Sequence, residues 1–146
     1  MPAWIKEKAT RLPKWKRGDR TQGFLWDAKG NQLADLTLTV GEDNRIRSGR
    51  VLAAREGLRP EWFPTREFHD HAEAHAAAML RQPDSPQEAS LVLNNTPCRS
   101  RGIYKGCNDM LPGMLPANKR LHVYLTDGER TWYYDTYDGT GEGVAE

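Results

Sequence analysis

Three separated segments of the chain carry side chains that bind transition metals or move protons. His71 and Glu73 stand two residues apart, Cys98 follows a proline, and Cys107 lies nine residues further on. One imidazole and two thiolates supply three zinc ligands and leave a fourth position for water, as in catalytic rather than structural zinc sites. Glu73 projects differently from His71, so it is free to take a proton from that water. The spacing therefore predicts a hydrolytic zinc site with Glu73 as the proton carrier.

The order of these residues matches a known type of zinc-site signature. His-x-Glu followed later by Pro-Cys-x-x-Cys is typical of zinc-dependent nucleobase deaminases. The match departs at one place, because eight residues, 99–106, lie between the cysteines where the signature has two. The ligands need only converge in space, and Gly102 and Gly106 ease the path of a loop that bulges outward.

Each ligand also has a simpler interpretation. His69, His71 and His75 are read as ordinary, partly exposed histidines when each is taken alone. Cys98 and Cys107 are compatible with a disulfide in an exported protein, or with two buried thiols. A different zinc site, pairing His69 with His75 or His122, has no supporting pattern. The joint occurrence of the residues in the right order favours the first interpretation.

The elements that must position these residues follow from periodicity and turn residues. Residues 23–26 and 32–40 flank a turn at 27–31, and Leu36, Leu38 and Val40 alternate with threonines, which predicts a β-hairpin. The later elements are expected as a helix over 71–81, a strand over 89–93, a helix from 107 to about 115, and strands over 120–125 and 131–137. The glycine-rich residues 138–146 are expected to fray.

This order of elements predicts the fold class. Helices interleaved with the middle strands indicate an α/β layered fold with a mixed five-stranded sheet. Only a tight turn joins the last two strands, so they must form an antiparallel hairpin, because a parallel pair needs a crossover of about a dozen residues.

Length, composition and charge narrow the class of protein. The chain has 146 residues, with 38% hydrophobic and 28% charged residues, which fits one domain. No apolar run suits a transmembrane helix or a secretion signal, and two cysteines are too few for a disulfide scaffold. Residues 1–20 carry seven Lys/Arg against two Asp/Glu and read as a basic arm or linker remnant. Residues 21–146 are then the zinc-dependent domain, and the arm suits a polyanionic partner.

The chain resembles the bacterial polymorphic-toxin cytidine deaminases, the group that contains the double-stranded-DNA deaminase toxins. The resemblance runs from about Gly23 to Tyr137 and rests on several short motifs. These are the hairpin at 23–30, His71-Ala-Glu73-Ala, Leu91-Val-Leu-Asn-Asn95, Pro97-Cys98 with Gly106-Cys107, the run 111–116, and the run 121–124. The resemblance implies a cytidine-deaminase-like three-layer fold and hydrolysis of the amidine C–N bond of cytosine to give uracil.

The resemblance and the local chemistry together suggest substrate contacts. The resemblance implies that backbone N–H groups around Ala72 hold the base carbonyl, and Asn94 or Asn95 are candidates for sugar or base-edge contacts. Arg99, Arg101 and Lys105 would contact phosphates. Aromatic residues are candidates for base stacking, among them Tyr104, and also Phe63, Trp62, Trp132 and Tyr133, for which a core role is the simpler interpretation.

The resemblance also implies a biological context. Such domains form the C-terminal part of larger exported toxins, so the expected setting is secretion or translocation and action in the target-cell cytoplasm. The expected partners are DNA, double- or single-stranded, and an immunity protein in the producing cell, with no membrane and a monomeric chain. The alternatives are an RNA or free-nucleoside deaminase, a non-catalytic zinc-stabilised nucleic-acid-binding module, and a disulfide-containing interaction domain.

Overall fold

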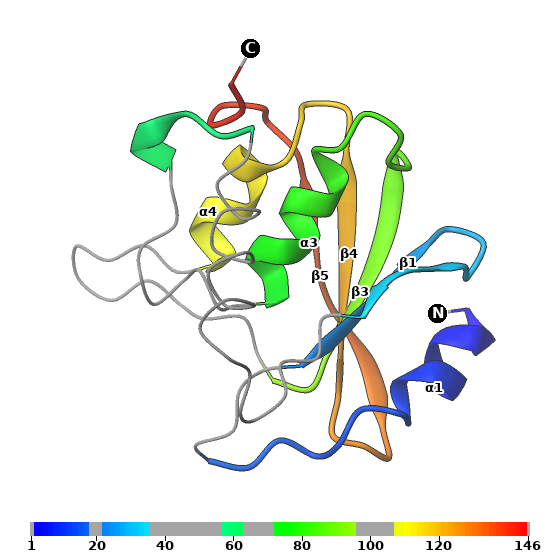
Figure 1. The fold of residues 1–146 in the computed structure, drawn as a ribbon. Coiled ribbons are helices and arrows are strands. Elements are labelled where there is room, and N and C mark those ends of the chain that lie inside the picture. Colours follow the sequence, from blue (N-terminus) through cyan, green and yellow to red (C-terminus); the bar gives the residue numbers. More distant parts are fainter. Residues whose placement is uncertain (1, 18–21, 36–56, 63–71, 96–106, 146) are drawn as a thin grey trace.

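A five-stranded mixed sheet organises the protein. The computed structural model describes residues 2–17, 22–35, 57–62, 72–95 and 107–145. The strands are β1 (Gly23–Asp27), β2 (Gln32–Asp35), β3 (Glu88–Leu93), β4 (Arg120–Thr126) and β5 (Thr131–Asp138). They lie in the order β2-β1-β3-β4-β5, and β3 with β4 is the parallel pair (Figure 1). The predicted mixed sheet and the antiparallel hairpin of the last two strands are confirmed.

Helices cover both faces of this sheet and make three layers. The helices α3 (Ala72–Leu80) and α4 (Cys107–Met114) pack on one face, where their apolar residues share a core with Leu91 and Val123. The helix α1 (Ala3–Ala9) packs on the other face against Val92 and Tyr124. Five successive residues of β3 are buried, as expected for a strand that is covered on both sides. The predicted three-layer fold is confirmed.

The helices are short, and local sequence explains their limits. The alanine-rich α3 has nine residues, and Pro83 follows shortly after its end. The eight-residue α4 contains Pro112, which lacks the N–H that a longer helix would use. A 3-10 turn, η1 (Pro60–Trp62), lies beside the end of α4. Within the described ranges, no helix has the length and apolar character needed to cross a membrane.

The connections between helices and strands place the ends of three elements at the same side of the sheet. The helix α3 leads into β3 through the short segment 81–87, so α3 runs back along the sheet. The helix α4 is the crossover that joins the parallel strands β3 and β4. The start of α3, the end of β3 and the start of α4 therefore lie at one side of the sheet (Figure 1). We call this side, where β3 and β4 end, the carboxyl end of the sheet.

The N-terminal segment is packed onto the sheet. Residues 1–20 were predicted to be a basic arm or linker remnant, with the zinc-dependent domain beginning at residue 21. Among the described residues of this segment, Ile5, Ala9 and Leu12 are buried to 1% exposure or less and contact the core around Trp26. The apolar residues of this segment therefore cover one face of the sheet, while the division at residue 20 stays a prediction.

The glycine-rich C-terminal segment is also held in place, which corrects the expectation that it frays. Backbone N–H groups of Gly139, Gly141 and Gly143 donate to carbonyl groups at 2.8–2.9 Å. Their acceptors are the carbonyl groups of Lys119, Leu115 and Gly113. Glycine-rich composition predicts flexibility, but in this segment the missing Cβ permits close backbone contact.

We expect Gly139→Ala to lower the free energy of unfolding by about 1–3 kcal/mol, as overpacking does elsewhere. A Cβ at this position would lie 1.9 Å from the carbonyl oxygen of Pro116, so the two backbones must separate. Urea denaturation measures the change. Glu142 is an exposed residue of the same segment, and Glu142→Ala is the control. Its free energy of unfolding should stay within about 0.5 kcal/mol of that of the parent protein. Equal stability of the two variants would contradict the observed packing.

Candidate active site

The predicted zinc ligands belong to elements that meet at the carboxyl end of the sheet. His71 immediately precedes α3, Cys98 follows β3, and Cys107 is the first residue of α4. His71 and Cys98 lie outside the described residues, as do the predicted substrate contacts Phe63, Arg99, Arg101, Tyr104 and Lys105. Among the described residues, no group of three His, Cys, Asp or Glu side chains is placed to hold a metal ion. The ligand assignment therefore stays a prediction.

Glu73, the predicted proton carrier, has a buried side chain. It is the second residue of α3 and is only 2% exposed. A carboxyl group is seldom buried in this way unless it has a polar partner or a chemical role. The first turn of a helix also stabilises negative charge. Glu73 thus offers a carboxyl group that is shielded from bulk water at the carboxyl end of the sheet.

Ala72, the predicted contact for the base carbonyl, is the first residue of α3. The first four backbone N–H groups of a helix have no acceptor within the helix. A substrate oxygen near this turn would lie beside N–H groups that the helix itself does not use. The backbone position of Ala72 is therefore compatible with the predicted role, which no described contact tests.

Asn94 and Asn95 follow β3 directly at the carboxyl end. Asn94 is 6% exposed, and its side-chain oxygen accepts from the backbone N–H of Gln22 at 2.8 Å. Its side-chain nitrogen donates to the carbonyl of Pro13 at 3.1 Å. These bonds fasten the N-terminal segment and the start of β1 to the end of β3. Asn95 is half-buried at the surface, and substrate contact by either residue stays a prediction.

A pocket of about 190 Å³ opens next to Asn95. It is lined by residues from the N-terminal segment, the end of β3 and the β4–β5 hairpin. These are Lys14, Trp15, Asn94, Asn95, Leu125, Thr126, Asp127 and Trp132. Sequence reasoning named Trp132 as a stacking candidate but did not link it to Lys14 and Trp15. The basic, Trp-containing character of the segment was the available signal, whereas its position depends on tertiary packing.

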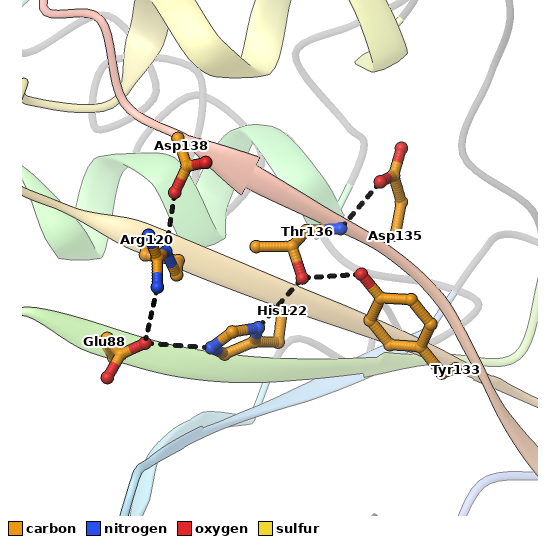
Figure 2. A network of polar contacts seen from close by, with 7 residues as sticks. All are labelled: Glu88, Arg120, His122, Tyr133, Asp135, Thr136 and Asp138. Atoms are coloured by element: carbon orange, nitrogen blue, oxygen red, sulfur yellow. Dashed lines mark hydrogen bonds and ion pairs between the residues drawn. The ribbon is translucent and has the colours of Figure 1, made fainter.

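His122, considered above as an alternative metal ligand, belongs to a separate polar network (Figure 2). Its ring nitrogens lie 2.9 Å from the hydroxyl of Thr136 and 3.1 Å from a carboxylate oxygen of Glu88. Residues alternate along β4, so His122 shares the face of Tyr124, which α1 covers, and not the face of α3. The network is therefore on the opposite face of the sheet from Glu73.

The remaining contacts of this network are cross-strand pairs at the surface. The Arg120 side chain donates to Asp138 at 2.6 Å and lies 3.6 Å from Glu88. Hydrogen bonding to Asp138 raises the pKa of Arg120 above its usual value. Exposed ion pairs contribute little to stability because water screens them. We interpret the network as a surface feature that links β3, β4 and β5.

Comparison with known proteins agrees with the motifs. A family model described as SCP1.201-like deaminase matches residues 1–142. No curated protein and no solved structure matches the chain. The matched region includes both the packed N-terminal segment and the elements that carry Glu73 and Cys107.

Proposed function

Because the chain belongs to the SCP1.201-like deaminase family, we propose that it hydrolyses the amino group of cytosine in DNA to give uracil and ammonia. Family membership supports a hydrolytic deaminase. The observation that carries the more specific proposal is the buried carboxyl group of Glu73, placed at the start of α3 beside the start of α4. Cytosine in DNA is proposed from the sequence motifs and from the basic segments around the site.

Zinc is the proposed cofactor, with His71, Cys98 and Cys107 as its ligands. The donor set fits the metal, because zinc in proteins favours imidazole and thiolate ligands, and three of them leave a position for water. The topology brings the three chain segments to one end of the sheet. When bound, zinc would lower the pKa of water to about 7 and so supply a nucleophile at neutral pH.

Glu73 is proposed to move the protons. Its carboxylate accepts a proton from the attacking water and delivers it to N3 of cytosine, which makes C4 more electrophilic. After the water oxygen bonds to C4, Glu73 takes the remaining proton from that oxygen and passes it to the amino nitrogen. The C4–N bond then breaks, ammonia leaves, and the oxygen remains as the C4 carbonyl of uracil. Its burial suits this role, because a proton held away from bulk solvent is transferred to the substrate rather than exchanged.

The predicted substrate contacts surround this centre in the proposal. Backbone N–H groups at Ala72 hold the base carbonyl, and Asn94 or Asn95 approach the sugar or base edge. Arg99, Arg101 and Lys105 neutralise phosphates, which adds affinity without reading sequence. Tyr104 and Phe63 stack on bases. In duplex DNA the target cytosine must first be flipped out of the helix.

The proposed setting is that of a toxin domain. We propose that the chain forms part of a larger secreted or translocated toxin, acts as a monomer in the cytoplasm of a target cell, and is neutralised in the producing cell by an immunity protein. The proposal depends on the resemblance to polymorphic-toxin deaminases. An enzyme that converts cytosine in DNA damages the genome of its host, which makes a dedicated inhibitor necessary.

Matched nucleic acids provide the test of the proposed function. Purified protein is incubated with single-stranded DNA, duplex DNA and RNA of one sequence, and each product is sequenced for C-to-U changes. We expect conversion in DNA and none at adenine, because a cytosine pocket is small. Conversion confined to RNA would assign the alternative RNA deaminase, and inosine without uracil would overturn the choice of base. No change in any substrate would contradict the proposal.

A further inference from the structure

We propose that the pocket between the N-terminal segment and the β4–β5 hairpin holds the base of a nucleotide that flanks the target cytosine on the same strand. Trp132 supplies the stacking surface, and Lys14 lies where it can meet a backbone phosphate. This inference rests on the proposed function, because it assumes a single strand of nucleic acid as substrate. It adds a binding site that the catalytic motifs do not contain.

The pocket is built by tertiary packing. The segment after α1 crosses the carboxyl end of the sheet beside the β4–β5 turn (Figure 1). The Asn94 amide holds this segment through the carbonyl of Pro13 at 3.1 Å. A Cβ added at Gly128 in the turn would lie 3.5 Å from the backbone nitrogen of Lys14. One hydrogen bond therefore joins the N-terminal segment to the end of β3, and the β4–β5 turn lies close to the same segment at Lys14.

The pocket opens on the side of the sheet that carries the catalytic helix. Trp132 pairs with Leu125 in the sheet, and directly opposite residues share a face. Leu125 belongs to the core that α3 and α4 form, so Trp132 lies on the face where Glu73 is found. Asn95, which lines the pocket, precedes Cys98 by three residues. An extended chain spans at most about 3.6 Å per residue, so the Cα atoms of Asn95 and the predicted ligand Cys98 lie at most about 11 Å apart.

Size and lining suit a single nucleobase. The pocket measures about 190 Å³, below the 300–1,000 Å³ that is usual for larger ligands. Trp132 is 44% exposed, although an indole of this size is normally covered. Every base offers a π face to such a side chain, so stacking on it tolerates any sequence.

The charge beside the pocket suits a polyanionic strand. The described residues 2–17 carry six Lys/Arg side chains and one acid, Glu7. Asp127 is the acidic residue among those that line the pocket. Backbone N–H groups of Arg130 and Glu129 donate to its carboxylate at 2.7 and 2.9 Å and lower its pKa. These bonds keep Asp127 ionised and hold its carboxylate on the turn, so the proposed phosphate position is at Lys14, on the wall of the pocket that the N-terminal segment forms.

Binding is tested with the zinc-loaded protein carrying Glu73→Gln, so that the substrate is not converted. The probe is a fluorescein-labelled single-stranded DNA of about twelve nucleotides with one central cytosine, followed by anisotropy. We expect Trp132→Ala to weaken binding about tenfold, and Trp132→Phe to recover most of the loss because it keeps an aromatic face. Lys14→Gln should reduce the salt dependence of log Kd by about 0.7, the value for one phosphate contact on a single strand.

Tyr133→Ala is the matched control. Tyr133, which the sequence also offers as a stacking candidate, is 53% exposed, but it pairs with Tyr124 on the opposite face of the sheet, where the two ring centroids lie 5.8 Å apart. It does not line the pocket and is left out of the proposed binding site. It should change binding less than twofold. Equal effects of Trp132→Ala and Tyr133→Ala, or no effect of either, would overturn the proposed pocket.

A second assay distinguishes failure of the proposed pocket from failure of the proposed reaction. Each Trp132 and Tyr133 variant is also made with Glu73 intact and assayed for uracil formation. Uracil formation that Trp132→Ala leaves unchanged would remove the pocket from the proposal and retain the enzyme. Trp132-dependent binding without uracil formation would retain the pocket and remove the proposed reaction.

Discussion

Glu73→Gln is expected to reduce uracil formation by about 10²- to 10⁴-fold, the usual contribution of a positioned acid–base group. Glutamine has nearly the same shape as glutamate but cannot accept and return a proton. The side chain of Glu73 is 2% exposed, so no solvent group easily replaces it. Because the shape is kept, the thermal midpoint and the zinc content should change little.

Single-turnover assays on the preferred DNA, together with thermal unfolding, measure this effect. Glu88→Gln is a matched control, because Glu88 is a partly exposed carboxylate at the opposite end of β3, where it contacts His122 and Arg120. It should retain activity within twofold. A Glu73→Gln protein with more than a tenth of the parent activity would remove Glu73 from the mechanism. A non-catalytic binding module would bind DNA with or without the Glu73 carboxyl group and would form no uracil in either case.

Much of the fold was predictable because local signals agreed with one another. The turn at 27–31 and the flanking apolar residues predicted β1 and β2. The strand β1 extends one residue past its predicted end, to Asp27, and β2 begins at the predicted Gln32. Residues 36–40 of the second predicted strand lie outside the described residues. The alanine-rich run 71–81 became α3, which is described from Ala72 and ends at Leu80, one residue before the predicted end. Residue 71 lies outside the described residues. The antiparallel hairpin of β4 and β5 followed from the length of its turn alone. In each case a signal from adjacent residues decided the structure.

The two termini were harder to predict because distant contacts decide their structure. Ile5, Ala9 and Leu12 do not form a long periodic pattern, yet they cover one face of the sheet and pack in one cluster with Trp26 of β1. The tail is held by backbone hydrogen bonds to residues 113–119, and composition carries no record of such bonds. Both segments were judged from their residue types, which describe an isolated chain rather than a packed one.

The candidate site also has features that the sequence predicts and features that depend on distant contacts. The types and order of His71, Glu73, Cys98 and Cys107 were readable from the sequence, and the topology places their segments at one end of the sheet. The role of Asn94 in fastening Gln22 and Pro13 was not readable, because its partners are 72 and 81 residues away in the chain. Candidate catalytic residues can be predicted from residue type and order, whereas the residues that line a pocket depend on which distant segments pack together.

Removal of any predicted zinc ligand is expected to abolish both metal binding and uracil formation. Cys107→Ala, Cys98→Ala and His71→Ala should each yield protein with far less than one zinc per chain. Cys107 begins α4, whose residues Leu111 and Met114 are fully buried in the core. Loss of the metal therefore releases the start of a helix that supports the core, and stability should fall together with activity.

The size of the stability change follows from mass action. A ligand that binds only the folded state at about a thousand times its Kd stabilises that state by about 4 kcal/mol. The chelated parent protein and the Cys107→Ala variant should therefore unfold at similar, lowered temperatures, and added zinc should restore only the parent. Metal analysis by mass spectrometry and thermal unfolding with and without chelator measure both effects.

His122→Ala is the control that distinguishes the effect of removing a zinc ligand from the effect of removing a histidine elsewhere. His122 contacts Thr136 and Glu88 on the face that α1 covers, so this variant should keep its zinc and its activity. The disulfide alternative makes the opposite prediction, because an oxidised Cys98–Cys107 pair would make stability sensitive to reductant and insensitive to chelator. A Cys98→Ala protein with full zinc and full turnover would refute the ligand set, since three ligands from three converging segments are the least that a catalytic zinc site requires.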